Sequence, residues 1–408
     1  MKTLIISLVS EQTIPNVRII NEFKNNTDNF ECFFVSTKKC RHQFENICKT
    51  CDIVPNKEKD VIEVEPENAK DIKFKLEQHK NTGFFETFDN IILNLTGGTK
   101  IMSLSAHAFF TEYYPDKTEE VYNTQNHKIN FLLNTEKDEK NYSRELTLKE
   151  YLTCYGLEYK ESNLSNIPYD TAKKLFHLFT DFDNLDQYKD IISYFRNNRG
   201  KNKIKIENDI KPFFEKIEYK PDEYLSKEEI KYFSGDWFEE YIYYSIKDEL
   251  NLDDEQIKTG VTVKVTLNNS DYAIRLKETL LKLTGKEDPD VNKNYVNNEI
   301  DVMFVYKNKL YIVECKTNIF IDGTKKDILN ETIYKSDSIK TRFGLFPNRS
   351  IITLTSFKHE INNRKDSKSA AMSFNAKIAR AVVSDITLID GCMLKNKYSV
   401  SKLLGISK

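Results

Sequence analysis

The sequence predicts an α/β fold with two sheet-containing domains and a connector made of helices between them. A chain of 408 residues is longer than a single hydrophobic core usually grows. Short apolar runs alternate with amphipathic segments through the first hundred residues, and a β-hairpin pattern followed by a helix and a strand occupies the C-terminal third. We expect the first domain at residues 1–145, the connector at 146–222 and the second domain at 223–408.

The composition is that of a folded chain, with 39% hydrophobic residues, 22 Tyr and 26 Phe, which is too aromatic for a disordered protein. A net charge of -2 argues against a generic basic protein that coats nucleic acid. The apolar start at residues 1–9 is short and is soon followed by Glu11, so it predicts a first strand and not a signal peptide. No run reaches the length of a membrane span, and we expect a cytoplasmic protein.

The seven cysteines are scattered, and their odd number fits reduced thiols in the cytosol. Cys40, His42, Cys48 and Cys51 include a Cys-x-x-Cys pair that could hold zinc. They also fall where a helix should follow a strand, and buried cysteines one helical turn apart are common. We therefore favour structural cysteines over a zinc site.

Four apolar runs are expected strands, at residues 3–9, 31–36, 61–65 and 89–95. Helix-length amphipathic segments separate them, among them 16–24 and 67–80. This alternation predicts a parallel sheet, and such sheets bind ligands at the carboxyl ends of their strands. The loops after the first and fourth strands are therefore the expected ligand site.

Both loops have unusual sequences. The fourth strand runs into Thr96-Gly97-Gly98-Thr99-Lys100 and then into an apolar helix. The glycines allow a tight turn, and the start of the helix offers free N–H groups and a positive dipole end to an anion. The first strand ends in a polar loop at residues 10–16. A plain strand-to-helix turn without a ligand would explain the Thr-Gly-Gly-Thr sequence equally well.

The charged stretch at residues 134–141 is expected to be a solvated turn that ends the first domain's sheet. From Leu146 to about Ile217 the pattern is helical, with Phe and Ile recurring on apolar faces. We interpret this segment as the connector. A winged-helix DNA-binding domain is the alternative, but the sequence shows no basic recognition helix, which favours structural packing.

Residues 298–306 and 309–316 are two β-type runs around the polar turn Lys307-Asn308, and they predict a hairpin. This turn places Tyr306 opposite Lys309, and the same register places Asp301 opposite Glu314. Cβ atoms of such directly opposed residues lie about 5 Å apart. Lys316, two positions after Glu314, points to the same side of the sheet.

Two carboxylates at facing positions repel each other unless a cation lies between them. Both runs are otherwise apolar, which argues against an ordinary ion-pair cluster at a sheet edge. Oxygen ligands suit magnesium or manganese, and the backbone carbonyl of Cys315 could join Asp301 and Glu314. Lys316 would orient a water and stabilise negative charge on a phosphate. The spacing predicts phosphodiester hydrolysis by metal-activated water.

Two further segments belong to this prediction. Residues 234–244 begin with turn residues and continue as an amphipathic helix with Glu239 in its first turn. First-turn acids are also favoured by the helix dipole alone, and Glu240 is an alternative to Glu239. A later helix carries cationic residues that we expect to bind phosphates of a nucleic acid, although each is equally well a solvated surface charge. These are Lys335, Lys340 and Arg342.

The loops at residues 10–16 and 94–100 together resemble those of a CARF domain, the CRISPR-associated Rossmann-like sensor, over roughly the first third of the chain. Such domains dimerise and bind cyclic oligoadenylates across the dimer interface. The resemblance implies ligand contacts from Ser10, Gln12, Thr13, Asn94, Thr96, Gly97, Gly98, Thr99, Lys100 and Met102.

The second half is similar to PD-(D/E)xK nuclease domains, which have a restriction-endonuclease-like α/β/α fold. Asp301, Glu314 and Lys316 stand at the spacing of that motif, and Ile300 replaces the Pro in its name, which the superfamily tolerates. A Gly-x-Trp-x-Glu sequence ending at Glu239 is a recurrent opening of the first helix in these domains, where the Glu helps to hold the metal.

Together the two halves resemble the CRISPR ancillary nucleases of the Card/Can type. That family implies a homodimer that binds cyclic tetra-adenylate during type III CRISPR immunity and then cuts DNA, RNA or both with manganese or magnesium. Two alternatives stay open: an ungated nuclease similar to a restriction enzyme, and a CARF-type transcriptional regulator with an inactive nuclease fold.

Overall fold

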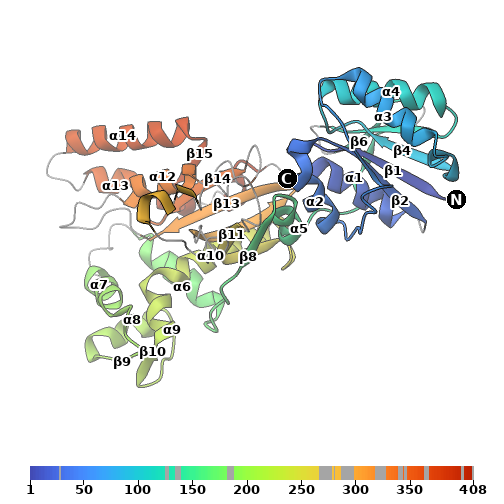
Figure 1. Ribbon diagram of the computed structural model, residues 1–408. Coiled ribbons are helices and arrows are strands. Elements are labelled where there is room, and N and C mark those ends of the chain that lie inside the picture. Colours follow the sequence, from blue (N-terminus) through green and yellow to red (C-terminus); the bar gives the residue numbers. More distant parts are fainter. Residues whose placement is uncertain are drawn as a thin grey trace. The chain divides into compact units, whose positions relative to one another are not determined.

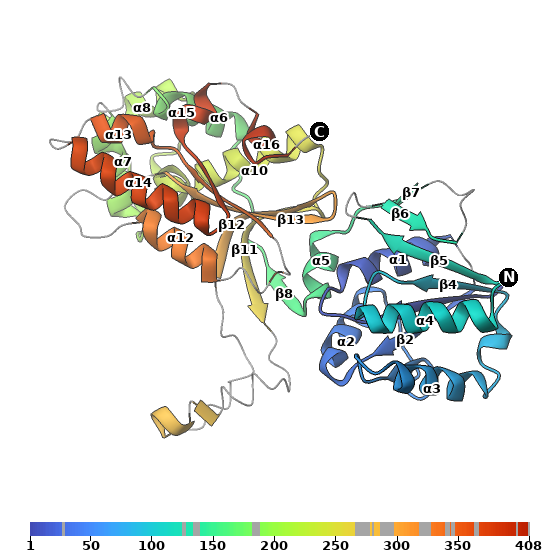
Figure 2. The same cartoon turned by 90° about the horizontal axis from the view of Figure 1, so that it is seen from above.

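The structure, a computed structural model, divides the chain into two compact units, which are residues 1–159 with 264–296 and residues 160–263 with 297–408. Figures 1 and 2 show the elements of both units from two directions. The residues that the structure describes are 1–26, 29–124, 128–133, 139–181, 188–265, 278–279, 281–285, 298–317, 328–338, 343, 347–362, 367–396 and 399–406.

The first unit contains a seven-stranded sheet with the order β3-β2-β1-β4-β5-β6-β7. The first five strands pair in parallel, whereas β6 and β7 pair antiparallel. The strands are β1 (Thr3–Leu8), β2 (Phe30–Ser36), β3 (Val61–Glu63), β4 (Asn90–Asn94), β5 (Thr118–Asn123), β6 (Lys128–Phe131) and β7 (Lys140–Asn141). The predicted parallel sheet is confirmed, and β1 and β4 are direct neighbours within it.

Helices cover both faces of this sheet (Figure 1). Leu4, Ile6 and Leu8 of β1 point into the core under α3 and α4, and Ile5 points into the opposite core with α1 and α2, as the alternation of a strand requires. The helices are α1 (Ile14–Asn25), α2 (Arg41–Thr50), α3 (Ala69–Lys80), α4 (Lys100–Tyr113) and α5 (Leu148–Cys154), with short 3₁₀ turns at η1 (Lys38–Cys40) and η2 (Phe85–Thr87).

The cysteines considered for zinc belong to the core beside α2. Cys40, Cys48 and Cys51 are buried there, whereas His42 is exposed. Burial raises the pKa of the Cys48 thiol to about 12, so this thiol is protonated at neutral pH.

The second unit is built on a six-stranded sheet with the order β15-β14-β13-β12-β11-β8. β12 pairs antiparallel with β11 and β13, whereas β13, β14 and β15 pair in parallel. The strands are β8 (Leu157–Lys160), β11 (Ile257–Val265), β12 (Asn298–Tyr306), β13 (Lys309–Lys316), β14 (Asn348–Thr353) and β15 (Ile386–Ile389). A separate two-stranded sheet joins β9 (Lys203–Lys205) to β10 (Tyr224–Ser226).

Helices α12 and α14 lie on one face of the six-stranded sheet, and α10 and α6 lie on the other (Figure 1). The helices of this unit are α6 (Tyr169–Phe179), α7 (Lys189–Asn198), α8 (Lys211–Lys216), α9 (Lys227–Lys231), α10 (Trp237–Leu250), α12 (Ile328–Ser338), α13 (Phe357–Asn362), α14 (Ser367–Val383), α15 (Gly391–Lys395) and α16 (Val400–Leu403), with a 3₁₀ turn at η4 (Asn208–Ile210) and a π-helical turn at η5 (Tyr232–Asp236).

The helices predicted as a connector pack against this sheet. One hydrophobic core contains Leu175 and Phe213 from that segment, Trp237 of α10, and Val302 and Val313 of the hairpin. The segment contains the helices α6, α7 and α8, but the prediction missed its two strands, β8 and β9. The domain boundaries after residues 145 and 222 stay predictions.

Throughout the described ranges, no helix combines the length and the apolar character that crossing a membrane requires.

Candidate active site

The hairpin of β12 and β13 has the predicted turn and register. Lys307 and Asn308 have φ values of 48° and 55°, as both central residues of a type I′ turn require. The ladder starts at Tyr306 and Lys309 and runs to Val302 and Val313. Asp301 and Glu314 come next along the two strands, at the point the sequence predicted.

The Asp301 carboxylate lies at the centre of the cluster. Its Oδ2 accepts a hydrogen bond from the Cys315 backbone N–H at 2.6 Å and another from Lys316 Nζ at 2.9 Å. The side chain is nearly enclosed, and Thr259 of β11 donates its hydroxyl to the Asp301 carbonyl at 2.8 Å. Hydrogen bonds from the two neighbouring strands therefore hold both ends of this residue.

Lys316 lies between the two acids. Its Nζ is 2.9 Å from Asp301 Oδ2, 3.3 Å from Glu314 Oε2 and 3.0 Å from the Cys315 carbonyl oxygen. Burial opposes the charged form, but the two carboxylates outweigh it and raise the Lys316 pKa. Lys316 is a permanent cation and compensates the repulsion between the acids.

Glu314 is 2% exposed and is held by two lysines. Its Oε2 faces Lys316, and its Oε1 accepts from Lys335 Nζ of α12 at 2.9 Å. Burial, followed by the Asp301 charge, raises the Glu314 pKa in spite of both lysines. Lys335 also donates to the Glu299 carbonyl at 2.6 Å. The structure thus places Lys335, predicted as a nucleic-acid contact, inside the carboxylate cluster.

Glu239 approaches the cluster from the first turn of α10. The π-helical turn η5 ends at Asp236, one residue before that helix begins. Burial raises the Glu239 pKa well above its usual range, and the charges of Asp301 and Asp236 add to this effect. Glu240 instead accepts hydrogen bonds from the Ser165 N–H at 2.6 Å and the Ser165 hydroxyl at 2.9 Å. This geometry favours Glu239 over Glu240 as the acid beside Asp301.

The donor set fits a hard divalent cation. Among the described residues, no group of three or more His, Cys, Asp and Glu side chains is arranged so that it could hold a metal ion. Magnesium binds typically through one or two carboxylates and keeps several waters, which is what Asp301, Glu314 and the Cys315 carbonyl can offer. Burial holds the Cys315 thiol pKa well above its usual range, so its carbonyl and not its sulfur belongs to this set.

The loops after β1 and β4 meet in the first unit. Asn94 Nδ2 donates to Asn16 Oδ1 at 2.8 Å, and Asn16 Nδ2 donates to the Leu8 carbonyl at 2.9 Å. Asn94 Oδ1 accepts the Thr96 N–H at 3.0 Å. A Cβ at Gly97 would lie 2.0 Å from the Leu8 carbonyl oxygen, so this position accepts no side chain without a backbone shift. Two buried asparagines therefore fix the loops relative to each other.

The predicted ligand residues divide by exposure. Thr13, Asn94 and Met102 are buried, and Thr13 donates to the Cys154 carbonyl at 2.8 Å. Gly97 is buried as well. The accessible members are Ser10, Gln12, Thr96, Gly98, Thr99 and Lys100, of which Lys100 is the most open. The role of all ten in ligand binding stays a prediction.

Several residues of these sites were missed or fall outside the described ranges. Lys340 and Arg342 lie outside the described residues. The contact of Lys335 with Glu314 was missed, although its place on the helix after the hairpin was a usable signal. Asn16 was noted only as a helix opener, and the role of its amide depends on β1 and β4 being adjacent.

Fold and sites define a class of protein: a Rossmann-like ligand-sensing domain on the same chain as a nuclease fold with a carboxylate–lysine cluster. Residues 4–151 match the family model described as the Card1 CARF domain, and residues 273–373 match that described as the Card1-like endonuclease domain. The two matches together cover more than half of the chain. The chain belongs to the CRISPR-associated family that joins a CARF domain to an endonuclease domain of the Card1 type.

Solved structures share the fold over almost the whole chain. Protein VC1899 from Vibrio cholerae superposes with a TM-score of 0.69 at 16% identity, covering 99% of this chain and 97% of that one. Can2 from Sulfobacillus thermosulfidooxidans, in complex with cyclic tetra-adenylate, gives 0.63 at 20% identity with the same coverage, 99% and 97%. No curated protein matches the sequence significantly.

A third solved structure is a type III CRISPR defence DNA nuclease activated by cyclic oligoadenylate. It gives a TM-score of 0.51 at 13% identity and covers 87% of this chain but only 46% of that one. At these identities the three likenesses establish the fold.

The approach of Gly97 to Leu8 makes a first prediction. We expect Gly97→Ala to force the two loops apart and to cost about 1–3 kcal/mol of stability. Thermal unfolding would measure this loss. Gly200→Ala is the control, because a Cβ there meets nothing within 4 Å. Unchanged stability in Gly97→Ala would contradict the loop geometry.

The raised Glu239 pKa makes a second prediction. A carboxyl whose pKa rises on folding destabilises the folded state once the pH exceeds the unfolded value of about 4.3. Glu239→Gln removes this cost, so we expect a higher melting temperature than wild type at pH 7 in EDTA, and no difference near pH 4. Scanning calorimetry checks it, with the exposed Glu215→Gln as control. A lower melting temperature for Glu239→Gln at pH 7 would refute the burial argument.

Proposed function

We propose that the protein is a metal-dependent nuclease of type III CRISPR defence and that a cyclic oligoadenylate, the tetra-adenylate ring, activates it. The observation that carries this proposal is the pair of buried carboxylates, Asp301 and Glu314, bridged by Lys316 on adjacent strands of an endonuclease-type domain. If the two acids had only a structural role, nothing would explain why two mutually repelling charges lie in the core of a sheet. DNA is the proposed substrate, and single-stranded RNA is tested beside it.

The residues divide the work as follows. Asp301 and Glu314, with the Cys315 carbonyl and Glu239, would hold magnesium or manganese, which when bound supplies an activated water and polarises the phosphate. The Cys315 N–H fixes the Asp301 carboxylate in place before any ligand arrives. Lys316, charged at any physiological pH, is oriented by three oxygens and stabilises negative charge that develops on the phosphate.

Lys335 has a separate part in this proposal. It neutralises Glu314 from the side of α12 through Oε1 of that carboxylate. Its ammonium group therefore lies beside the proposed metal ligands, where it would be within reach of a phosphate held there. We propose that Lys335 contacts the nucleic acid at the centre of the site.

The sensor half of the proposal rests on the CARF domain and on the fold shared with Can2, which was solved with cyclic tetra-adenylate. The accessible polar groups of the two loops, together with Lys100 at the start of α4, suit the phosphates and adenines of such a ring. We propose a homodimer, because two copies of these loops would enclose one ring. Ligand energy would then shift the subunits towards the cutting arrangement.

A cleavage assay on supercoiled plasmid and single-stranded RNA, with manganese and with or without cyclic tetra-adenylate, tests the whole proposal. We expect cutting only with the activator, and a loss of at least about 100-fold in Glu314→Gln with unchanged activator affinity. Lys100→Ala is the partner variant, since it should weaken activator binding and leave the cluster intact.

The alternatives give different results. Full cutting without activator, unaffected by Lys100→Ala, would establish an ungated nuclease. Activator binding with no cutting of either substrate would establish a sensor with an inactive nuclease fold.

Metal binding can be tested without cleavage. Manganese at 100 times its dissociation constant should stabilise the wild-type protein by about 2.7 kcal/mol, because it binds the folded state. We expect Asp301→Asn to abolish this thermal shift and Lys100→Ala to retain it. Equal shifts in wild type and Asp301→Asn, measured by scanning fluorimetry against EDTA, would argue against these metal ligands.

A further inference from the structure

Arg196 of α7 and Arg199, the C-cap residue of that helix, reach the candidate active site from outside the carboxylate–lysine cluster. Arg196 Nη2 donates to Thr317 Oγ1 at 3.3 Å, and Thr317 directly follows Lys316 at the end of β13. Arg199 lies nearly one helical turn further along the chain. No functional role of α7 can be predicted from its sequence, because nothing in its local pattern relates it to the hairpin.

Arg199 contacts the turn that positions Glu239. Its Nη1 donates to Ser234 Oγ at 3.1 Å, and its Nη2 donates to Asp236 Oδ1 at 2.5 Å. Ser234 and Asp236 belong to η5, the turn that leads into α10. A Cβ at Gly235, between them, would lie 3.5 Å from Thr317 Oγ1 and 3.7 Å from Arg199 Nη1. The α7 arginines, η5 and the end of β13 therefore meet at one place.

The positive charge at this place is incompletely compensated. Arg199 has a carboxylate partner in Asp236, whereas the contact that the described structure gives Arg196 is with the neutral hydroxyl of Thr317. The contact with Thr317 uses only one of the five N–H donors of the Arg196 guanidinium. Burial of the group and the nearby charge of Arg199 lower the Arg196 pKa. Although the Arg196 guanidinium is partly desolvated, both residues keep a large exposed surface through which a ligand can approach.

We propose that Arg196 and Arg199 bind a backbone phosphate of the nucleic acid adjacent to the phosphate that is cut. The planar fork of a guanidinium matches phosphate oxygens, and an anion bound here would reduce the repulsion between the two arginines. This inference rests on the proposed nuclease function and adds two substrate-binding residues to it. A phosphate contact carries no base information, so it serves DNA and RNA alike.

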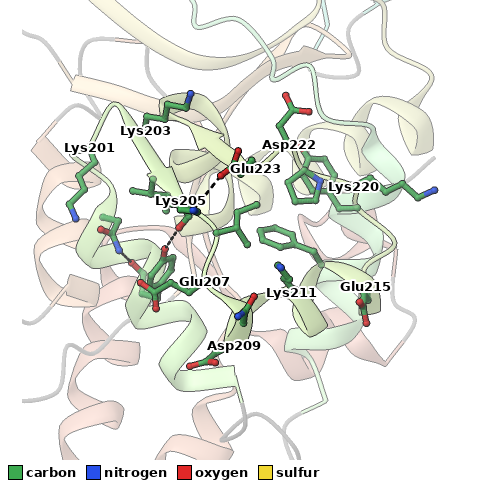
Figure 3. Close-up of a pocket in the computed structure, with 18 residues that line it drawn as sticks. Lys201, Lys203, Lys205, Glu207, Asp209, Lys211, Glu215, Lys220, Asp222 and Glu223 are labelled. Carbon is green, nitrogen blue, oxygen red and sulfur yellow. Dashed lines mark hydrogen bonds and ion pairs between the residues drawn. The ribbon is translucent and has the colours of Figure 1, made fainter.

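A groove of about 1400 Å³, which Tyr194 and Asn198 of α7 help to line, is the alternative path for a strand (Figure 3). Five lysines and five acidic residues line it, and Lys205 Nζ lies 3.3 Å from Glu223 Oε1. A polyanion gains little from a surface on which the charges balance. The phosphate contact is therefore assigned to the arginines, and Lys203 of the groove provides a matched control.

The test uses full-length Glu314→Gln as a reference that binds without cutting, together with cyclic tetra-adenylate, magnesium and fluorescent single strands of DNA and RNA. In this background we expect Arg196→Ala to reduce by about 10-fold the affinity for the strand that the reference binds. It should also lower the slope of log affinity against log salt by about 0.7, which is the value for one lost phosphate contact on a single strand. Arg196→Lys should recover part of the affinity, because it keeps the charge and loses the fork. Lys203→Ala should change neither quantity.

The outcomes separate this inference from the nuclease proposal. If the reference binds a strand and Arg196→Ala binds it with the same affinity and salt slope, the inference is overturned while the nuclease proposal stands. If the active protein cuts no strand but the reference still shows the Arg196 effect, the nuclease proposal fails and the phosphate site stands. Each variant should have the melting temperature and the activator affinity of the reference, and equal values exclude a folding defect. If Arg196→Ala does not fold, Arg196→Gln replaces it.

Discussion

Two acidic side chains on adjacent strands, inside a sheet whose other residues there are apolar, set the main constraint on the second unit. Asp301 and Glu314 are 8% and 2% exposed, and like charges so enclosed are costly unless cations accompany them. Lys316 supplies one cation from the same strand as Glu314, and Lys335 supplies another from α12. The cluster is thus stabilised by lysines on both sides of Glu314.

The surrounding elements follow from that constraint. Helix α12 has to pack where Lys335 can reach Glu314, and α10 has to begin where its first-turn acid comes near Asp301. The π-helical turn η5 sets the start of α10 in place, and Arg199 binds this turn from α7. In the first unit, uncharged hydrogen bonds play the equivalent part, because the side-chain amides of Asn16 and Asn94 link the ends of β1 and β4.

How much the sequence predicts depends on the range of the interaction. The hairpin register follows from a two-residue turn and strict alternation, so Asp301 and Glu314 could be placed together from local pattern alone. Strands β1 to β4 of the first unit and their parallel pairing follow from the alternation of apolar runs and helices, whereas β5, β6 and β7 were not predicted. The Lys335–Glu314 pair, the amide link of Asn16 to Asn94 and the approach of Arg196 to Thr317 join distant segments, and no local pattern encodes them. The connector helices could be predicted from their local apolar pattern, but the hydrophobic core that they share with the hairpin depends on tertiary contacts.

The turn at Lys307 and Asn308 has a consequence for how such a protein can diverge. Because side chains alternate along a strand, a change of length in this turn that shifts the hairpin register by one residue would turn Asp301 and Glu314 to opposite faces of the sheet. Both turn residues have a left-handed backbone, which Asn, Asp and Gly accept most readily. The length of this turn therefore matters more to the carboxylate pair than the identity of its two residues.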